Sequence, residues 1–371
     1  MRMVGSVRSI AALLAVLLLT GCTADPVPRA VPAPQPSTTT ASPDQFTLVA
    51  AGDLLIHPLL TEQAVKDGNG KRDYRQILQG MKPVIEGADL ALCHMEIPLL
   101  PDGSPFTGYP DFGAPPEIAQ AAKDLGYDGC DTASNHTMDK GPTGVKSTLD
   151  ILDAAGLKHT GSARNAAENV PAVYPVKGAK LAHLAYTYGY NGRTLPADKP
   201  WIANTIDPQR ILADARKAKA EGADIVVVSL HQGDEYKADP TGTQVSIAKQ
   251  LTADPSIDLL LGHHAHVVQP FEKVNGKWVV YGLGNQVARH SEPQGTTEEG
   301  VTARFTFQRS DRKWIVSKAE YIPTLVEFGP PIRLLDLTKE QATDRRKQAL
   351  TRTEEVMLRR GAGQAGLTRG H

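Results

Sequence analysis

The stretch Ile257-Asp258-Leu259-Leu260-Leu261-Gly262-His263-His264-Ala265-His266 indicates the fold, because an apolar run stops abruptly at a cluster of histidines. Short apolar runs of this kind are typical of buried strands. Open α/β sheets bind their ligands just beyond the carboxyl ends of the strands. His264 and His266 are two residues apart, so on an extended backbone they would point to the same side and could serve two ions.

The same organisation recurs along the chain. Further apolar runs cover residues 46–51, 88–92, 225–230 and 278–281, and helical patterns cover residues 116–125, 145–155, 208–220 and 245–251. Gly126, Gly156 and Gly222 are placed as helix stops, and Pro208 follows Asp207 at a suitable first helical position. The alternation of strands and helices predicts a layered α/β fold, and no internal repeat indicates a solenoid or propeller.

Residue types that bind metals follow the strand ends in five segments. Segments 52–57 and 94–96 each supply a carboxylate, and segments 134–139, 229–236 and 261–266 hold five of the eleven histidines. Imidazole combined with carboxylate and amide oxygen suits Mn, Fe or Zn, whereas an all-oxygen shell would favour Mg or Ca. A lone histidine could simply be a hydrogen-bonded core residue or a surface residue. Five segments together predict a shared metal site.

The order of these motifs resembles the CapA family, the poly-γ-glutamate capsule biosynthesis proteins of the calcineurin-like metallophosphoesterase superfamily. The resemblance covers residues 46–321. Its motifs are Ala51-Gly52-Asp53, His94-Met95-Glu96, Phe112–Glu117, Ser134-Asn135-His136, Leu230–Tyr236, Gly262–Pro270 and Tyr281–Asn285. The resemblance implies an α/β protein with a layered β-sandwich flanked by helices, and two divalent transition-metal ions (Mn, Fe or Zn) at one edge of the sheets.

The resemblance also implies a set of metal ligands that is shared between two ions. In the family pattern, Glu96 bridges both ions, and the remaining ligands divide between the two sites. Asp53 and His266 complete the first site, and Asn135, His231 and His264 complete the second.

One further role and one departure follow from the family pattern. His136 is expected to act in catalysis as a general acid or electrostatic stabiliser, the alternative being a histidine that only hydrogen-bonds its loop. Asp53 is followed by leucine at both next positions, where metallophosphoesterases carry Asp-x-His. His57 could replace the missing ligand only if the backbone turns there; otherwise it is a surface or helix-start histidine.

The N-terminus has the features of an export signal. Arg2 and Arg8 precede an apolar run over residues 10–19, which ends in Leu19-Thr20-Gly21-Cys22. The run is about half of the ~20 residues that a transmembrane helix needs. Leu-Thr-Gly-Cys resembles the bacterial lipoprotein signal, which implies a lipid on Cys22 and an extracytoplasmic protein anchored to the bacterial cell membrane. An ordinary secretory peptide or a short buried helix is the alternative.

Four parts are expected along the chain: a lipoprotein signal peptide with its lipobox at 1–22, a Pro/Thr-rich disordered stalk at 23–44, the CapA-like domain at 45–338, and a C-terminal segment at 339–371. The stalk has six prolines and almost no large apolar residue. The C-terminal segment predicts an exposed helix followed by a disordered tail. Cys93 and Cys130 could form a disulfide in an exported protein or remain small buried hydrophobes.

The expected function is hydrolysis of a phosphoester or a related anionic substrate in capsule or cell-envelope polymer metabolism. Enzymatic activity itself stays open, because a binuclear centre can also hold an anionic polymer without cleaving it. The competing hypothesis is a non-catalytic accessory factor that binds or anchors poly-γ-glutamate or the capsule synthase subunits. The net charge of −1 and the lack of a dense basic run argue against a nucleic-acid partner, and no polycationic groove is visible in the sequence.

Overall fold

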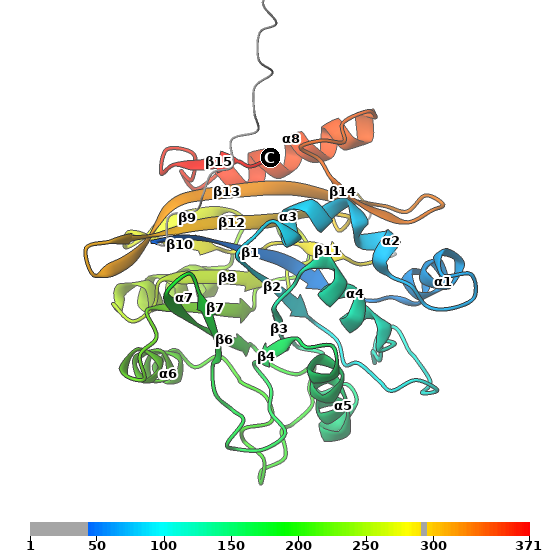
Figure 1. Ribbon diagram of the computed structural model, residues 1–371, viewed down its shortest axis with the longest axis horizontal. Coiled ribbons are helices and arrows are strands. Elements are labelled where there is room, and N and C mark those ends of the chain that lie inside the picture. Colours follow the sequence, from blue (N-terminus) through cyan, green and yellow to red (C-terminus); the bar gives the residue numbers. More distant parts are fainter. Residues whose placement is uncertain (1–43, 291–294) are drawn as a thin grey trace, which may run out of the picture. The chain divides into compact units, whose positions relative to one another are not determined.

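Two β-sheets flanked by helices form the framework of the protein in the computed structural model (Figure 1). The structure describes residues 44–290 and 295–371, which fall within one compact unit. The predicted signal peptide and nearly all of the predicted stalk lie outside the described residues. In the described ranges, no helix combines the length and the apolar character needed to cross a bilayer.

The first sheet runs in the order β14-β13-β12-β1-β2-β3-β4, with β11 paired to β1 and β15 paired to β13. Strands β1, β2, β3 and β4 pair in parallel, whereas β12 and β13 form a long antiparallel hairpin beside β1. The strands of this sheet are β1 (Gln45–Leu54), β2 (Leu90–Met95), β3 (Gly129–Asp131), β4 (Lys158–Thr160), β11 (Asn285–Val287), β12 (Glu299–Ser310), β13 (Lys313–Glu327), β14 (Arg333–Asp336) and β15 (Leu367–Arg369).

The second sheet runs in the order β5-β6-β7-β8-β10-β9. Its strands are β5 (Ala172–Val176), β6 (Ala179–Thr187), β7 (Ile225–His231), β8 (Leu259–His263), β9 (Phe271–Val274) and β10 (Lys277–Val280). Strands β6, β7, β8 and β10 pair in parallel. In both sheets, therefore, several parallel strands deliver their carboxyl ends to one edge, where the loops that carry the predicted ligands begin.

The alternation of side chains along the strands explains the layers. In β7, Ile225 and Val227 belong to the apolar core that also contains residues of the first sheet, whereas Val226 and Val228 pack with residues of α6 and α7. Successive strand residues point to opposite faces, so a continuous apolar strand covered on both faces fits this position. The two sheets thus form a sandwich whose outer faces are covered by helices, which confirms the predicted α/β class and layered sandwich.

The helices cover both sheets. They are α1 (Pro58–Asp67), α2 (Arg75–Leu78), η1 (Gln79–Met81), α3 (Lys82–Glu86), α4 (Glu117–Leu125), α5 (Gly141–Ala154), α6 (Pro208–Ala220), α7 (Gly242–Ala253) and α8 (Asp344–Leu358). Gly126 ends α4 with a φ of 115°, and the Asp207 side chain accepts a hydrogen bond from the Gln209 backbone N–H at the start of α6. Both predicted helix boundaries are therefore confirmed.

The prediction for the C-terminal segment, an exposed helix followed by a disordered tail, is wrong in two respects. Helix α8 is not simply exposed, because Ala349, Val356 and Met357 are buried on one of its faces. The expected disordered tail contains strand β15, which pairs in parallel with β13 and buries Leu367. The apolar residues of this segment are sparse but lie where they contact the first sheet, as Figure 1 shows for α8 and β15 beside β13.

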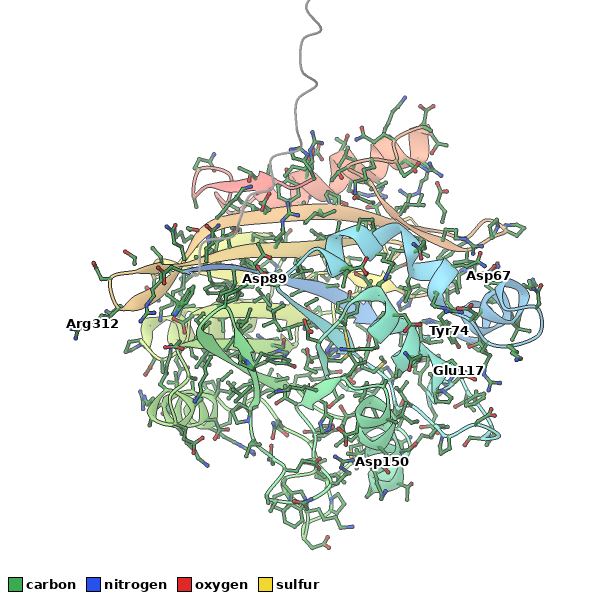
Figure 2. The ribbon with its side chains drawn as sticks, viewed as in Figure 1. Asp67, Tyr74, Asp89, Glu117, Asp150 and Arg312 are labelled. Carbon is green, nitrogen blue, oxygen red and sulfur yellow. A yellow bond between two sulfur atoms is a disulfide. The ribbon has the colours of Figure 1, made fainter. Side chains whose placement is uncertain are left out.

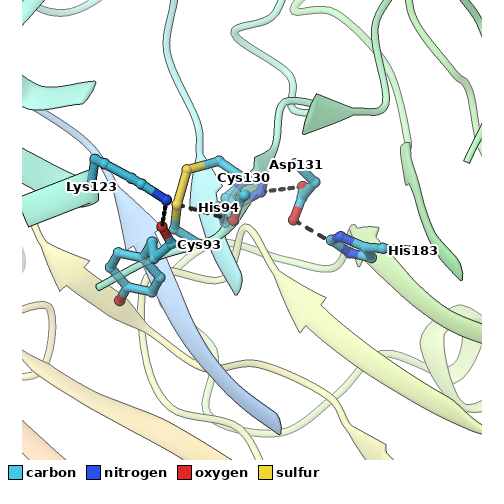
Figure 3. Close-up of a disulfide and its surroundings, with 8 residues drawn as sticks. Cys93, His94, Lys123, Cys130, Asp131 and His183 are labelled. Carbon is cyan, nitrogen blue, oxygen red and sulfur yellow. Dashed lines mark hydrogen bonds and ion pairs between the residues drawn. A yellow bond between two sulfur atoms is a disulfide. The ribbon is translucent and has the colours of Figure 1, made fainter. Parts of the chain in front are cut away.

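The open question of the two cysteines has a clear answer. Cys93 and Cys130 are directly opposite each other on the parallel strands β2 and β3, with Cα atoms 4.3 Å apart, and they form a disulfide (Figure 3). The bond joins the two strands one residue before His94 and Asp131.

Candidate metal centre

All six predicted metal ligands converge in one buried cluster at the carboxyl ends of the parallel strands. Each is at most 3% exposed. They are Asp53 near the end of β1, Glu96 directly after β2, Asn135 in the loop after β3, His231 at the end of β7, and His264 and His266 in the loop after β8.

Glu96 lies between the two predicted groups of ligands. Its Oε1 atom is 3.6 Å from His266 Nε2 and 4.0 Å from His231 Nε2. Both carboxylate oxygens are buried and have no hydrogen-bond partner among the described residues. A buried carboxylate without a partner is costly, so an oxygen-binding cation would satisfy this group.

Asp53 is held by the histidine loop after β8. Its Oδ1 atom is 3.1 Å from His263 Nδ1, its Oδ2 atom is 3.3 Å from His266 Nδ1, and the backbone N–H of His264 points to Oδ2 at an N–O distance of 3.4 Å. The atoms of Asp53, Glu96 and His266 that could bind a metal all lie within 4.8 Å of one another.

The sequence prediction that His264 and His266 share one side of an extended strand is wrong in its geometry. Both residues have a positive φ, 90° for His264 and 55° for His266, so the backbone is a left-handed loop beyond the end of β8. The two ring centroids are 6.1 Å apart. Positive φ is costly for residues other than glycine, and such strain concentrates at functional sites. The loop still brings both imidazoles to the cluster.

The second group of ligands is oriented by a chain of buried hydrogen bonds. His231 Nε2 is 2.8 Å from Asn135 Oδ1, and His231 Nδ1 is 3.0 Å from His94 Nε2. His94 Nδ1 is in turn 2.6 Å from Asp131 Oδ1 (Figure 3). His183 Nε2 lies farther from Asp131, at 3.9 Å from Oδ2, and its hydrogen-bond partner is Ser229 Oγ at 2.8 Å. Partners of this kind fix the ring of a metal-binding histidine. The sequence prediction missed Asp131, the last residue of β3, and His183, which lies inside β6.

The pKa values of the cluster reflect burial opposed by neighbouring charges. Burial raises the pKa of Glu96 to about 7. Burial alone would lower the pKa of His266, but the carboxylates of Glu96 and Asp53 outweigh it and raise this pKa to about 10. Burial and the charge of His266 lower the pKa of His264 to about 3, so His264 is neutral near pH 7 and its Nδ1, which lacks a partner in the described residues, is free to bind a cation.

His136, the predicted catalytic residue, lies beside the cluster and outside the three groups of closely spaced ligand atoms at this centre. Its Nδ1 atom is 2.7 Å from Asp139 Oδ2, and its ring packs edge-on against Phe112 at 4.8 Å between centroids. Asp139 also accepts a hydrogen bond from the Phe112 backbone N–H. The imidazole is thus fixed by one carboxylate through one nitrogen, which leaves Nε2 for proton transfer.

His57 does not take the place of the missing ligand. It is the residue before α1, and its Nδ1 atom lies 3.1 Å from the Arg289 backbone N and 3.1 Å from the Leu55 backbone O. The alternative of a helix-start histidine is therefore confirmed. His290, which the sequence prediction did not use, packs between His57 and His266, with ring centroids 5.1 and 4.7 Å away.

The residues present fit divalent metal binding. The donor set combines carboxylate, amide and imidazole groups, is buried, and contains oxygen and nitrogen atoms that lack partners within the described ranges. Such a set suits a transition metal. Glu235, an exposed carboxylate at the rim, also reaches within 4.8 Å of the ligand atoms of His264 and His266.

Comparison with known proteins places this chain among capsule proteins. A sequence profile described as bacterial capsule synthesis protein PGA_cap matches residues 47–290. The capsule biosynthesis protein CapA of Bacillus anthracis is 26% identical over 296 residues, which cover 78% of this chain and 69% of that protein. The PGA biosynthesis protein CapA of Bacillus subtilis (strain 168) is 33% identical over 175 residues, which cover 46% of this chain and 45% of that protein.

Solved structures with a similar arrangement include the calcineurin-like phosphoesterase YfkN from Bacillus subtilis and a 5'-nucleotidase precursor from Thermus thermophilus. YfkN is 14% identical with a TM-score of 0.46, over 84% of this chain and 97% of that one. The nucleotidase precursor is 16% identical with a TM-score of 0.45, over 84% of this chain and 58% of that one.

Proposed function

Because this chain belongs to the family of bacterial capsule synthesis proteins, as the order of its motifs predicts, we propose that it is a metal-dependent hydrolase that acts on a phosphoester or a related anionic substrate of the cell envelope. The observation that carries the proposal is the position of Glu96. Its buried carboxylate has no hydrogen-bond partner among the described residues and lies within 4.0 Å of a histidine from each predicted ligand group.

Two divalent transition-metal ions, Mn, Fe or Zn, would be held by the six converging residues. Asp53 and His266 would serve the first ion, Asn135, His231 and His264 the second, and Glu96 both. When bound, such ions supply Lewis-acid activation of water and neutralise charge on a substrate oxygen.

The chain's own residues prepare the site for this chemistry. His263 orients Asp53, and the pair His94 and Asp131 orients His231, so both ligands are held before any ion arrives. His136, fixed by Asp139, would donate a proton from its free nitrogen to the leaving oxygen or stabilise its charge. The walls of the site are buried, which strengthens each of these electrostatic interactions.

We further propose that the protein is extracytoplasmic and anchored to the membrane through a lipid on Cys22. The disulfide between Cys93 and Cys130 supports this location, because structural disulfides persist in oxidising compartments. The anchor would hold the domain at the outer face of the cell membrane.

The competing proposal is an accessory factor that holds an anionic polymer or a capsule synthase subunit without cleaving a bond. It is favoured by Leu55, which stands where metallophosphoesterases carry a histidine ligand, and by the position of His57, which does not replace it. A first site with fewer ligands would bind its ion more weakly.

One experiment separates the two proposals. The full chain, purified in mild detergent without chelator, is measured for transition metals by elemental analysis and for turnover of a chromogenic phosphodiester. The hydrolase proposal expects bound metal, turnover, and loss of turnover after chelation. Metal without turnover of this or other anionic substrates supports the accessory role, and metal-free protein that still supports capsule formation contradicts both.

A further inference from the structure

A basic groove lies at the end of the sandwich opposite to the metal centre. Residues of its lining lie before or at the starts of β7, β8 and β10, whereas the metal ligands follow the ends of β7 and β8. Its other wall is the turn between β12 and β13, and Figure 2 labels Arg312 at the tip of this turn, far from Asp67 at the end of α1. The cavity has a volume of about 720 Å³.

Positively charged side chains lie on both walls of the groove. The cations of the lining are Lys219, Lys273, Lys277, Arg312 and Lys313. Three come from the side of the second sheet and two from the β12–β13 turn. They are spread over about a hundred residues of sequence, which is why no dense basic run reveals them.

The acidic residues of the lining, Asp224 and Asp258, offset part of this charge, and Lys219 is paired. Asp258 is engaged by Lys219, at 2.7 Å, and by the Val226 backbone N–H. Asp224 accepts a hydrogen bond from the Lys180 backbone N–H. Within the described ranges, no carboxylate lies in ion-pair distance of Lys273, Arg312 or Lys313, although the same ranges hold many paired surface cations.

The floor of the groove is apolar and aromatic. Trp278, Phe307 and Trp314 line it and are at most 7% exposed, whereas Ile315 at its side is 50% exposed. The ammonium group of Lys273 lies 5.6 Å from the centre of the Trp278 ring. The groove thus offers cations along its rim and an exposed apolar side chain, Ile315, beside a nearly buried aromatic base.

We propose that this groove binds a segment of an unbranched polycarboxylate chain. Such a chain matches both features, because its carboxylates would meet Lys273 on one wall and Arg312 and Lys313 on the other, and its methylene groups would contact the exposed Ile315 side chain. The volume of the groove falls within the ~300–1,000 Å³ that is usual for sites of discrete ligands. A flat bilayer surface, by contrast, is met by protruding amphipathic or polybasic segments.

Anionic lipid is nevertheless the occupant that the test has to exclude. The described chain begins at the same end of the molecule, because Gln45 pairs with Gln308 and the Arg309 backbone N–H donates to Asp44 O at 2.8 Å. A membrane tether would therefore be joined to the domain close to the groove. Polymer binding in the groove does not require a working metal centre, so it stands apart from the proposed hydrolysis.

The test measures binding of a fluorescein-labelled glutamate oligomer to the full chain by fluorescence anisotropy. The double variant Arg312→Glu/Lys313→Glu should lose at least about tenfold in affinity, because it turns the charge of one wall from attractive to repulsive. The matched control is Lys146→Glu/Lys347→Glu, which makes the same change in net charge at side chains that are 68% and 62% exposed outside the groove. Its affinity should stay within about twofold of wild type.

Further arms of the experiment identify the ligand and the site. Binding should weaken as the salt concentration rises, and it should persist after metals are removed with a chelator. Binding should also change the tryptophan fluorescence of wild-type protein, and this change should be smaller in Trp314→Phe protein. The proposal is overturned if the oligomer does not bind, if both double variants lose affinity equally, or if vesicles with anionic lipid bind through Arg312 and Lys313 while the oligomer does not. It is also overturned if chelation abolishes binding, because the metal centre would then be the site.

Discussion

At the scale of single residues, Glu96 determines whether the two ligand groups act as one centre. It is the residue assigned to both ions, and its carboxylate lies within 4.0 Å of His231 and His266. Glu96→Gln should weaken metal binding by at least about tenfold, because removal of even a supporting group typically costs that much. His57→Ala is the matched control, since His57 is half-buried nearby but bonded to backbone atoms. Equal metal occupancy in Glu96→Gln and wild type would refute the assignment.

His136 separates metal binding from proton transfer. It lies outside the three groups of ligand atoms at the centre and is fixed by Asp139, so His136→Ala should keep its metal. If the protein hydrolyses a phosphodiester, turnover should fall by ~10²–10⁴, the usual contribution of general acid–base catalysis. Elemental analysis and steady-state kinetics on the same sample check both parts. Unchanged turnover would contradict the role of His136 in proton transfer but would not affect the assignment of the metal ligands.

His94 makes the stability of the metal-free protein depend on pH. Burial alone would lower its pKa, but the carboxylates of Asp131, Asp53 and Glu96 raise it to about 9, above the ~6.5 of an unfolded chain. The folded state therefore holds this proton more tightly. Its stabilising contribution is fully present below ~pH 6.5 and is lost as the pH rises through about 9.

The metal-free His94→Gln variant should accordingly lose more stability near pH ~6 than near pH ~10, relative to wild type. Urea unfolding of chelator-treated protein at both pH values measures the difference. His159→Gln, whose ring lies on β4 beside Asp153, is a control away from the centre. A destabilisation by His94→Gln that is independent of pH would show that packing, and not the bound proton, explains the effect.

At the scale of elements, the sequence predicts those parts of the fold that have a strong local pattern. The predicted run 225–230 lies in β7 and the predicted helix 208–220 coincides with α6, because apolar periodicity and an N-cap aspartate mark them. The long strands β12 and β13 were not predicted from their pattern. Their burial changes along their length, and β13 is exposed over much of its first half, so no regular alternation identifies it.

The site also has parts that the sequence predicts and parts that it does not. Its six candidate ligands could be chosen from the sequence because they lie at or beyond strand ends in a recognisable order, but their supports could not. Asp131 contacts His94 because β2 and β3 are neighbours, and His94 contacts His231 across the two sheets, so these roles depend on the strand order. The left-handed backbone at His264 is likewise set by the tertiary structure and not by local preference.

The C-terminal segment offers a test of an element that the sequence prediction missed. Leu367 in β15 is 4% exposed and belongs to the core of the first sheet. Leu367→Ala should lower the free energy of unfolding by about 2–5 kcal/mol, the usual effect of truncating a buried leucine. Leu358→Ala at the end of α8, where the side chain is 36% exposed, should change it by less than ~1 kcal/mol. Denaturant unfolding with equal small effects for both would support a disordered tail.

At the scale of the whole molecule, two sites of different chemistry lie at opposite ends of one sandwich. The metal centre uses the carboxyl ends of the parallel strands, and the basic groove uses their starts together with the β12–β13 turn. The described chain begins beside that turn.

The tether itself gives the last prediction. Cys22 follows the apolar run of the expected signal, so Cys22→Ala should block lipid attachment and either release the protein from the membrane or leave the signal uncleaved. Detergent partitioning of cells that express the variant, with the mass of the mature chain, measures both results. Cys93→Ser/Cys130→Ser is the matched control, because it removes the two other cysteines, which are paired in a disulfide and cannot carry the lipid. This control should stay in the detergent phase. If Cys22→Ala also stays there with an unchanged mature mass, the lipid anchor is wrong and another contact must hold the protein at the membrane, for which the basic groove is the first surface to test.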